Sequence, residues 1–327
     1  MTLFLRSIRG KVTLNSFSMI YNDRTGEGAM KKKFISKIIN KYVLPHRSLY
    51  FKNDEEFEKF IDKQHYKNLK PHRQPEMLNI KSNLEKQQHG HMQVFRANFH
   101  HKLTTKILYI HGGYNILQPS VFHWRWIDKL ALNTLCEVVM PIYPKAPSYS
   151  AIDTYEALHS MYQQLLSEVG AEDIIVMGDG SGGGLALSLV QQLIAAGQPL
   201  PNQLYLISPL LDGTFSNSAI TSELEVKDLL NNKEGIQKVL QLWAGNLTQT
   251  DPWVSPIYGN MTHLPPTYMF GGTEELYYPD MVKLGDLYER NQNTIHFHQF
   301  YRMIHDFPLF PLHESHRVLK EICQTIQ

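Results

Sequence analysis

The sequence predicts an α/β fold in which a mostly parallel central sheet is covered by helices on both faces. Three observations predict it. Short apolar segments bounded by turn residues recur from about residue 90, and helical patterns separate them. Such alternation is typical of parallel sheets that are buried on both sides. Unusual glycine-rich or charged loops also follow three of these segments, at the strand ends where ligands bind in such sheets.

The expected elements follow one another in chain order. The predicted strands are short apolar runs at Met92–Phe99, Ile107–Ile110, Leu135–Pro141, Ile174–Met177, Leu204–Ile207, Thr267–Phe270 and Ile295–Tyr301. A helix is predicted over Ala151–Val169, because Ser150 is a suitable N-cap and Gly170 follows its last turn. Further helices are predicted at Leu185–Ala196 and near Arg317–Ile326.

The first 75 residues or so differ from the rest, since they are polar and mainly helical in pattern. They predict an N-terminal helical cap segment over residues 1–75 and an α/β core domain over residues 76–327. A polar helical stretch near 213–248 is predicted to be a second cap insertion within the core domain. Apolar residues at helical spacing support the first segment: Phe34, Ile38, Ile39 and Tyr42, and then Phe57, Phe60 and Ile61.

The composition excludes several classes of protein. Among 327 residues, 32 Lys+Arg stand against 31 Asp+Glu, a formal net charge of +1, which argues against nucleic-acid binding. No apolar stretch approaches the roughly 20 residues of a membrane-spanning helix. With only Cys136 and Cys323, a disulfide framework is excluded and a cytoplasmic location is expected. No cofactor is expected, and no ligand set for a metal is complete.

The first unusual loop is His111-Gly112-Gly113-Tyr114, which follows the predicted strand Ile107–Ile110. Two adjacent glycines let the backbone pass close to a ligand and direct its N–H groups inward. Such preorganised donors can hold a developing oxyanion. A tight turn that uses glycine only for its shape is the alternative interpretation.

The second loop, GDGSGGG at 178–184, follows the predicted strand Ile174–Met177 and runs straight into a helix. Phosphate binding at the helix N-terminus is one interpretation. The dinucleotide fingerprint expects an acidic residue at a strand end about 20 residues on, whereas Asn202 and Gln203 stand there. The competing interpretation is a nucleophile elbow, which needs small residues two positions either side of a strained nucleophile.

The third feature combines two loops. Glu274 and Glu275 follow the predicted strand Thr267–Phe270, and His305 follows Ile295–Tyr301. An elbow, an acid and a histidine thus occur in the order that is typical of α/β-hydrolases.

From about residue 90 to its end, the chain resembles the hormone-sensitive-lipase-like esterases of the α/β-hydrolase fold. The motifs that carry the resemblance are HGG at 111–113, YPKAP at 143–147, GDGSGG at 178–183, SPLLD at 208–212, DPWVSP at 251–256 and the acid and histidine loops. The resemblance implies hydrolysis of short-chain acyl esters. It implies that His305 is the general base and that Glu274 orients it, with Glu275 and Asp280 as alternative acids.

The resemblance also implies an oxyanion hole formed by the N–H groups of Gly112, Gly113 and the residue after the nucleophile. Tyr114 and Asp179 are expected beside the substrate. The expected partner is a small-molecule ester, with no nucleic acid and no stable membrane insertion. The sequence neither predicts nor excludes a homodimer.

The sequence departs from the family at the nucleophile. Without gaps, the family serine falls on Gly180 and the small residue after it on Ser181. In one interpretation Ser181 is the nucleophile after a one-residue shift, although Asp179 would then crowd the elbow. In the second, the chain is a natural relative that lost its serine. In the third, the serine was replaced by design.

In both of the last two interpretations Gly180 stands at the elbow and Ser181 supplies an oxyanion N–H. The scaffold is then a carboxylesterase whose activity in this chain is impaired. The alternative function is a non-catalytic module that binds a small molecule in the same fold, and a nucleotide binder is a more distant alternative.

Overall fold

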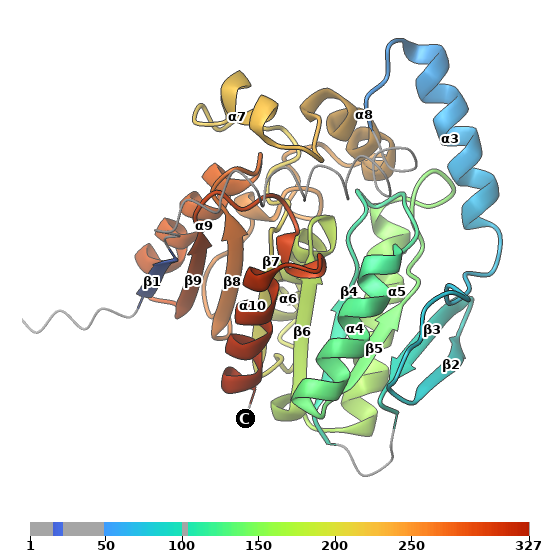
Figure 1. The fold of residues 1–327 in the computed structure, drawn as a ribbon, viewed down its shortest axis with the longest axis vertical. Helices are drawn as coiled ribbons and strands as arrows, with labels where there is room; N and C mark the ends of the chain where they lie inside the picture. The colour runs from blue at the N-terminus through green and yellow to red at the C-terminus, as the bar shows by residue number, and fades with distance from the viewer. Residues whose placement is uncertain (1–15, 22–48, 100–103, 327) are drawn as a thin grey trace, which may run out of the picture.

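The computed structural model describes residues 16–21, 49–99 and 104–326, and the fold is that of these residues. Its centre is a nine-stranded sheet with the order β1-β9-β8-β7-β6-β4-β5-β3-β2 (Figure 1). The parallel strands are β1, β9, β8, β7, β6, β4 and β5. At one edge, β3 pairs antiparallel with β5, and β2 pairs antiparallel with β3. The predicted α/β class with a mostly parallel sheet is therefore confirmed.

The bounds of the strands lie close to the predicted ones. The strands are β1 (Ser16–Tyr21), β2 (Leu84–His89), β3 (Met92–Ala97), β4 (Lys106–Ile110), β5 (Glu137–Pro141), β6 (Ile174–Asp179), β7 (Gln203–Ile207), β8 (Thr267–Gly272) and β9 (Ile295–Phe300). The α-helices are α3 (Asp54–Asn68), α4 (Val121–Thr134), α5 (Ala151–Glu168), α6 (Ser181–Ala195), α7 (Ser222–Lys227), α8 (Lys233–Ala244), α9 (Tyr278–Arg290) and α10 (His313–Thr325). Among the described residues, no helix has both the length and the apolar composition needed to cross a bilayer.

The buried side chains form one layer on each side of the sheet. In β4, Leu108 and Ile110 belong to one layer, and Ile107 and Tyr109 belong to the other. This division follows from the alternation of side chains along a strand. Helices α5, α6 and α9 pack against the first layer, and α4 and α10 against the second. Because both faces are covered, the polar chemistry is confined to the loops at the strand ends.

Two strands were not predicted. The edge strand β2 is polar, and β1 pairs in parallel with β9, so Ser16–Tyr21 belongs to the core sheet and not to a helical cap. The expected helix around Phe57 is α3, which begins after Asn53, whose side chain accepts from the backbone N–H of Glu56. The apolar positions expected between residues 34 and 42 lie outside the described residues.

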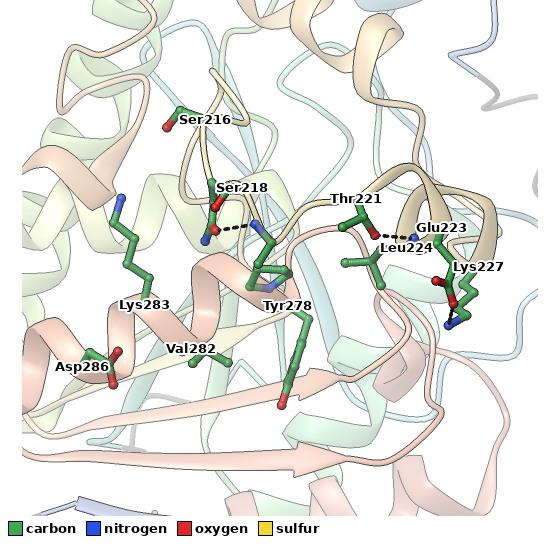
Figure 2. Close-up of a pocket in the computed structure, with 13 residues that line it drawn as sticks. Ser216, Ser218, Thr221, Glu223, Leu224, Lys227, Tyr278, Val282, Lys283 and Asp286 are labelled. Carbon is green, nitrogen blue, oxygen red and sulfur yellow. Dashed lines mark hydrogen bonds and ion pairs between the residues drawn. The ribbon is translucent and has the colours of Figure 1, made fainter.

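The stretch that was predicted to be a second cap insertion contains α7 and α8, which Figure 1 shows above the carboxyl ends of the strands. A groove of about 800 Å³ lies between the stretch that includes α7 and the helix α9 (Figure 2). Its walls carry exposed charges, among them the pair Glu223–Lys227 at 2.6 Å. None of the loops singled out by the sequence lines this groove, so it is separate from the expected site.

Candidate active site

Gly180 forms the turn between β6 and α6, with φ +51° and ψ −123°. A Cβ atom on Gly178 would lie 2.2 Å from the carbonyl oxygen of Gly182, and one on Gly182 would lie 2.1 Å from that of Ile110. No side chain fits at those distances, so both positions require glycine. The backbone therefore makes a sharp strand-to-helix turn with position 180 at its apex, where the ungapped alignment puts it.

The apex faces His305. A Cβ atom on Gly180 would lie 3.4 Å from Nε2 of His305 and 3.3 Å from Oδ2 of Asp306, so a small side chain here would point at the ring and would need a slight shift of its neighbours. Ser181 lies elsewhere: its hydroxyl oxygen accepts from the backbone N–H of Asn115 at 3.2 Å. Among the described contacts, none joins Ser181 to His305. The geometry thus gives position 180, and not Ser181, the place beside the histidine.

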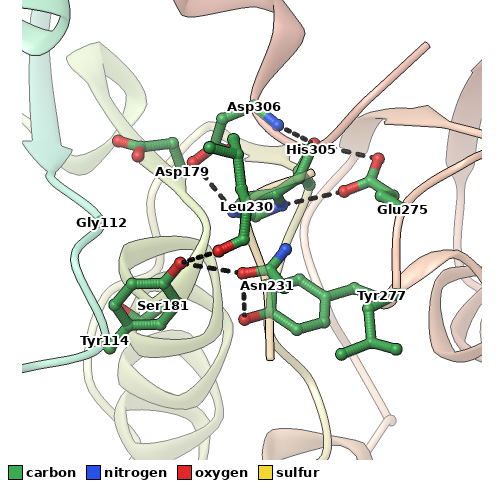
Figure 3. Close-up of polar contacts among 12 residues, drawn as sticks. Gly112, Tyr114, Asp179, Ser181, Leu230, Asn231, Glu275, Tyr277, His305 and Asp306 are labelled. Atoms are coloured by element: carbon green, nitrogen blue, oxygen red, sulfur yellow. Dashed lines mark hydrogen bonds and ion pairs between the residues drawn. The ribbon is translucent and has the colours of Figure 1, made fainter. Parts of the chain in front are cut away.

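His305 lies in the loop after β9 and is buried. Its Nδ1 lies 3.0 Å from Oε2 of Glu275, a fully buried carboxylate after β8 (Figure 3). Oε1 of Glu275 accepts from the hydroxyl of Ser208 at 3.1 Å. A carboxylate fixed in this way holds the imidazole in one orientation, with its Nε2 toward the apex.

The expectation that Glu274 contacts His305 does not hold in this geometry. The Glu274 carboxylate lies 3.6 Å from Nε of Arg302, and its side chain is 13% exposed, whereas that of Glu275 is fully buried. The reason is local, because the side chains of adjacent residues in the loop point in different directions, and only that of Glu275 turns inward. The other alternative acid, Asp280, is buried in α9 and accepts from the amide of Asn217 at 2.9 Å.

A second carboxylate contacts the other ring nitrogen. Oδ2 of Asp306 lies 3.0 Å from Nε2 of His305, an interaction that the sequence motifs do not predict. Burial lowers the pKa of His305, but Asp306 and Glu275 more than offset this, so the pKa of the ring lies well above its ordinary value. The two acids therefore favour the protonated form of the imidazole that lies between them.

The oxyanion loop differs from the expectation at Gly112. Its backbone N–H bonds to the carboxylate of Asp179, which also accepts from the hydroxyl of Tyr109 and from Nε2 of His123 at 3.0 Å. Burial opposes ionisation of Asp179, but these three donors more than offset it and lower its pKa. Gly112 thus contacts Asp179, and Asp179 is not among the residues that line the cavity in front of the loop. Gly113 borders the cavity in front.

A cavity of about 70 Å³ lies over the elbow. Its walls are Gly113, Tyr114, Ser120, Phe122, His123, Gly180, Ser181, Leu230, His305, Asp306, Leu309 and Phe310. Tyr114 is the expected pocket residue that does line it. Leu230, from the stretch before α8, lines the cavity, and the neighbouring Asn231 accepts through Oδ1 from the hydroxyls of Tyr114 at 3.0 Å and Tyr277 at 3.2 Å (Figure 3).

His123 and Leu230 line the cavity although neither belongs to one of the three loops that the sequence singles out. His123 lies eleven positions beyond Gly112, and only its place in the first turn of α4 indicates that it faces the strand ends. Among the described residues, no group of three His, Cys, Asp or Glu side chains has an arrangement suited to a metal ion.

Comparison with known families decides the classification. Residues 107–309 match a family described as having the alpha/beta hydrolase fold. The chain belongs to this family. The crystal structure of a candidate esterase from Staphylococcus aureus is 49% identical, with a TM-score of 0.87, and covers 89% of this chain and 98% of that one. The resemblance to the hormone-sensitive-lipase-like esterases of the α/β-hydrolase fold is thereby confirmed.

Curated relatives agree with this classification. A triacylglycerol lipase of Mycobacterium tuberculosis is 33% identical over 183 residues, which are 56% of this chain and 37% of that lipase. An esterase of Acinetobacter venetianus is 30% identical over 209 residues, which are 63% of this chain and 69% of that esterase. The match thus spans about a third of the length of the lipase. An α/β-hydrolase of the esterase and lipase type is supported, and the activity of this chain is a separate question.

Proposed function

We propose that the chain is a scaffold for the hydrolysis of short-chain carboxylic esters whose nucleophile position is occupied by glycine. One observation carries the proposal. A Cβ atom at position 180 would lie 3.4 Å from Nε2 of His305, while Nδ1 of that ring contacts Glu275. A serine at this apex would stand within reach of a base that is already oriented, which is the arrangement that activates a hydroxyl nucleophile.

With a hydroxyl at position 180, His305 would take its proton, and the oxygen would attack the ester carbonyl to form an acyl-enzyme. Gly113 and Ser181 border the cavity, and their N–H groups would stabilise the oxyanion, aided by the N-terminus of α6. His305 would return the proton to the leaving alcohol, and water activated by the same ring would release the acid. Gly180 lacks the hydroxyl, so this chain is expected to be nearly silent.

The test is hydrolysis of p-nitrophenyl acetate by the unmodified chain and by two variants. Gly180→Ser is expected to raise kcat/KM by about 10²-fold or more and to introduce labelling by a fluorophosphonate probe. Ser181→Ala is expected to change neither quantity, because alanine keeps the backbone N–H. Abolition of activity by Ser181→Ala, with no gain from Gly180→Ser, would show that Ser181 is the nucleophile and that the proposal is wrong.

One observation favours a second function, non-catalytic binding of a small ester. Gly180 removes the nucleophile but leaves the closed cavity over the elbow intact. Binding without turnover would appear as a rise in melting temperature with phenyl acetate while no phenol is released. Release of phenol at a rate that saturates with ester concentration would exclude this function.

A further inference from the structure

Asp306 contacts the nitrogen of His305 that the hydroxyl of a serine at position 180 would contact. Its Oδ2 lies 3.0 Å from Nε2 of His305 and 3.3 Å from the Cβ position on Gly180. The nitrogen that would accept a proton from a residue at position 180 therefore already contacts a carboxylate. Figure 3 shows His305 between this group and Glu275.

The backbone holds Asp306 in this position. Asp306 has φ +51°, in the left-handed region that Asp tolerates better than most residues. Its N–H donates to the hydroxyl oxygen of Ser208 at 3.1 Å, and that hydroxyl donates to Glu275. Ser208 thus links the backbone of Asp306 to the carboxylate of Glu275. The arrangement is built into the loop and is more than a chance contact of a surface side chain.

The other carboxylate oxygen of Asp306, Oδ1, is buried and has no hydrogen-bond partner within the described residues. An unpaired buried oxygen costs free energy, and a hydroxyl or water in the cavity would relieve that cost. The ion pair between Oδ2 and His305 offsets part of the free-energy cost of burying this carboxylate.

We propose that Asp306 is a positioning residue that acts through His305: it competes with any hydroxyl at position 180 for Nε2 and keeps the ring protonated. The inference rests on the proposed function. Two features then inactivate this chain together. One is the absence of a serine at position 180, and the other is the Asp306 carboxylate, because a protonated imidazole cannot act as a general base.

The groups that face His305 come from several elements. They are Glu275 and Tyr277 from the acid loop, Asp306 from its own loop and, through Asp306, Asp179 and His123. Of these, Asp306 alone contacts Nε2 among the described residues. Removal of its charge is therefore expected to change the proton affinity of the ring without disturbing Glu275.

The first test does not depend on activity. Asp306→Asn keeps the size of the side chain and tolerates the positive φ, while Asp306→Gly removes the side chain altogether. In the Gly180 chain, NMR titration of His305 is expected to show its pKa lowered by about one unit or more in both variants. The matched control is Glu274→Gln, which removes a charge from the neighbouring loop and is expected to leave the titration unchanged. An unchanged His305 titration in both Asp306 variants would overturn the proposal.

The second test uses the Gly180→Ser background. Adding Asp306→Asn or Asp306→Gly is expected to shift the rising limb of the kcat–pH profile downward by about one unit and to raise kcat at pH 7 by about tenfold, with little change in KM. A fall in kcat on removal of Asp306 would instead make it an aid to catalysis and would contradict the inference. If the Gly180→Ser protein neither hydrolyses the ester nor takes up the fluorophosphonate, with or without Asp306, the proposed function fails. The NMR titration still decides the role of Asp306 in that case.

Discussion

Two buried histidines, His123 and His305, line the same cavity, but their ring nitrogens have different partners. His123 contacts Asp179 through Nε2, while its Nδ1 accepts from the backbone N–H of Ser120 at 2.9 Å. Both nitrogens of His123 are therefore occupied by partners within the folded chain, and neither faces position 180. His305, in contrast, has a carboxylate at each nitrogen, and these two acids raise its pKa. Burial and a carboxylate partner therefore do not by themselves mark a catalytic base. The partner of the second nitrogen separates a structural histidine from a reactive one.

The largest expected effect tests the acid that orients His305. In the Gly180→Ser background, Glu275→Gln is expected to lower kcat for p-nitrophenyl acetate by about 10²–10³-fold, because the buried amide no longer stabilises the imidazolium. Glu274→Gln is the matched control, since that side chain faces Arg302, and it is expected to change kcat by less than about twofold. Steady-state kinetics at pH 8 measures both. Equal decreases in kcat in the two variants would show that Glu275 does not orient His305 more than Glu274 does.

This pair of residues also shows what could be predicted from the sequence. The order of elbow, acid and histidine follows from motifs, but the choice between Glu274 and Glu275 does not. Both follow the same strand, and only the path of the loop turns one of them inward. Asp306 was missed for a similar reason, because its contact with His305 depends on a left-handed backbone conformation at one residue.

The fold was easier to predict than the site. Strands such as β6 are buried on both faces and appear as continuous apolar runs, which the sequence displays directly. Strand β2 was missed because its sequence, LEKQQH, is polar and half exposed at the edge of the sheet. The predicted glycines at 178 and 182 follow from elbow sterics, which depend on local backbone geometry alone.

The second prediction concerns His123. Replacement of His123 by Phe is expected to lower the free energy of unfolding by about 3 kcal/mol at pH 7, because Asp179 loses a donor and the N-cap of α4 loses its reciprocal bond. The folded state lowers the pKa of Asp179, so ionised Asp179 stabilises the fold above its unfolded value of 3.8, and this contribution disappears as pH falls through the folded value. The decrease in the free energy of unfolding caused by His123→Phe is therefore expected to become smaller toward pH 3.

Denaturant unfolding at pH 7 and at low pH measures this difference. The control is His159→Phe, since His159 is half exposed and bonds only to Gln192 among the described contacts, and a change under about 0.5 kcal/mol is expected. A cost for His123→Phe that stays constant with pH would mean that Asp179 is not the group that His123 stabilises.

The smallest effect involves a third histidine, His111, and the buried amine beside it. Nζ of Lys145 lies 3.3 Å from Nε2 of His111, and burial lowers the pKa of Lys145 to about 7. Between pH 7 and the ordinary value of 10.5, the unfolded chain binds a proton that the folded chain has released, so stability contributed by this group rises with pH. At about 1.4 kcal/mol per pH unit, the gain from pH 7 to 9 is about 2 kcal/mol.

Two lysine variants test this slope by denaturant unfolding between pH 7 and 9. Lys145→Met is expected to remove the slope, whereas Lys86→Met, at an exposed position, is expected to retain it. Parallel dependences of unfolding free energy on pH in Lys145→Met and the unmodified chain would show that Lys145 stays charged. In that case the lysine would add a positive charge to the oxyanion loop, and His111 would join His305 as a histidine governed by a neighbouring charge.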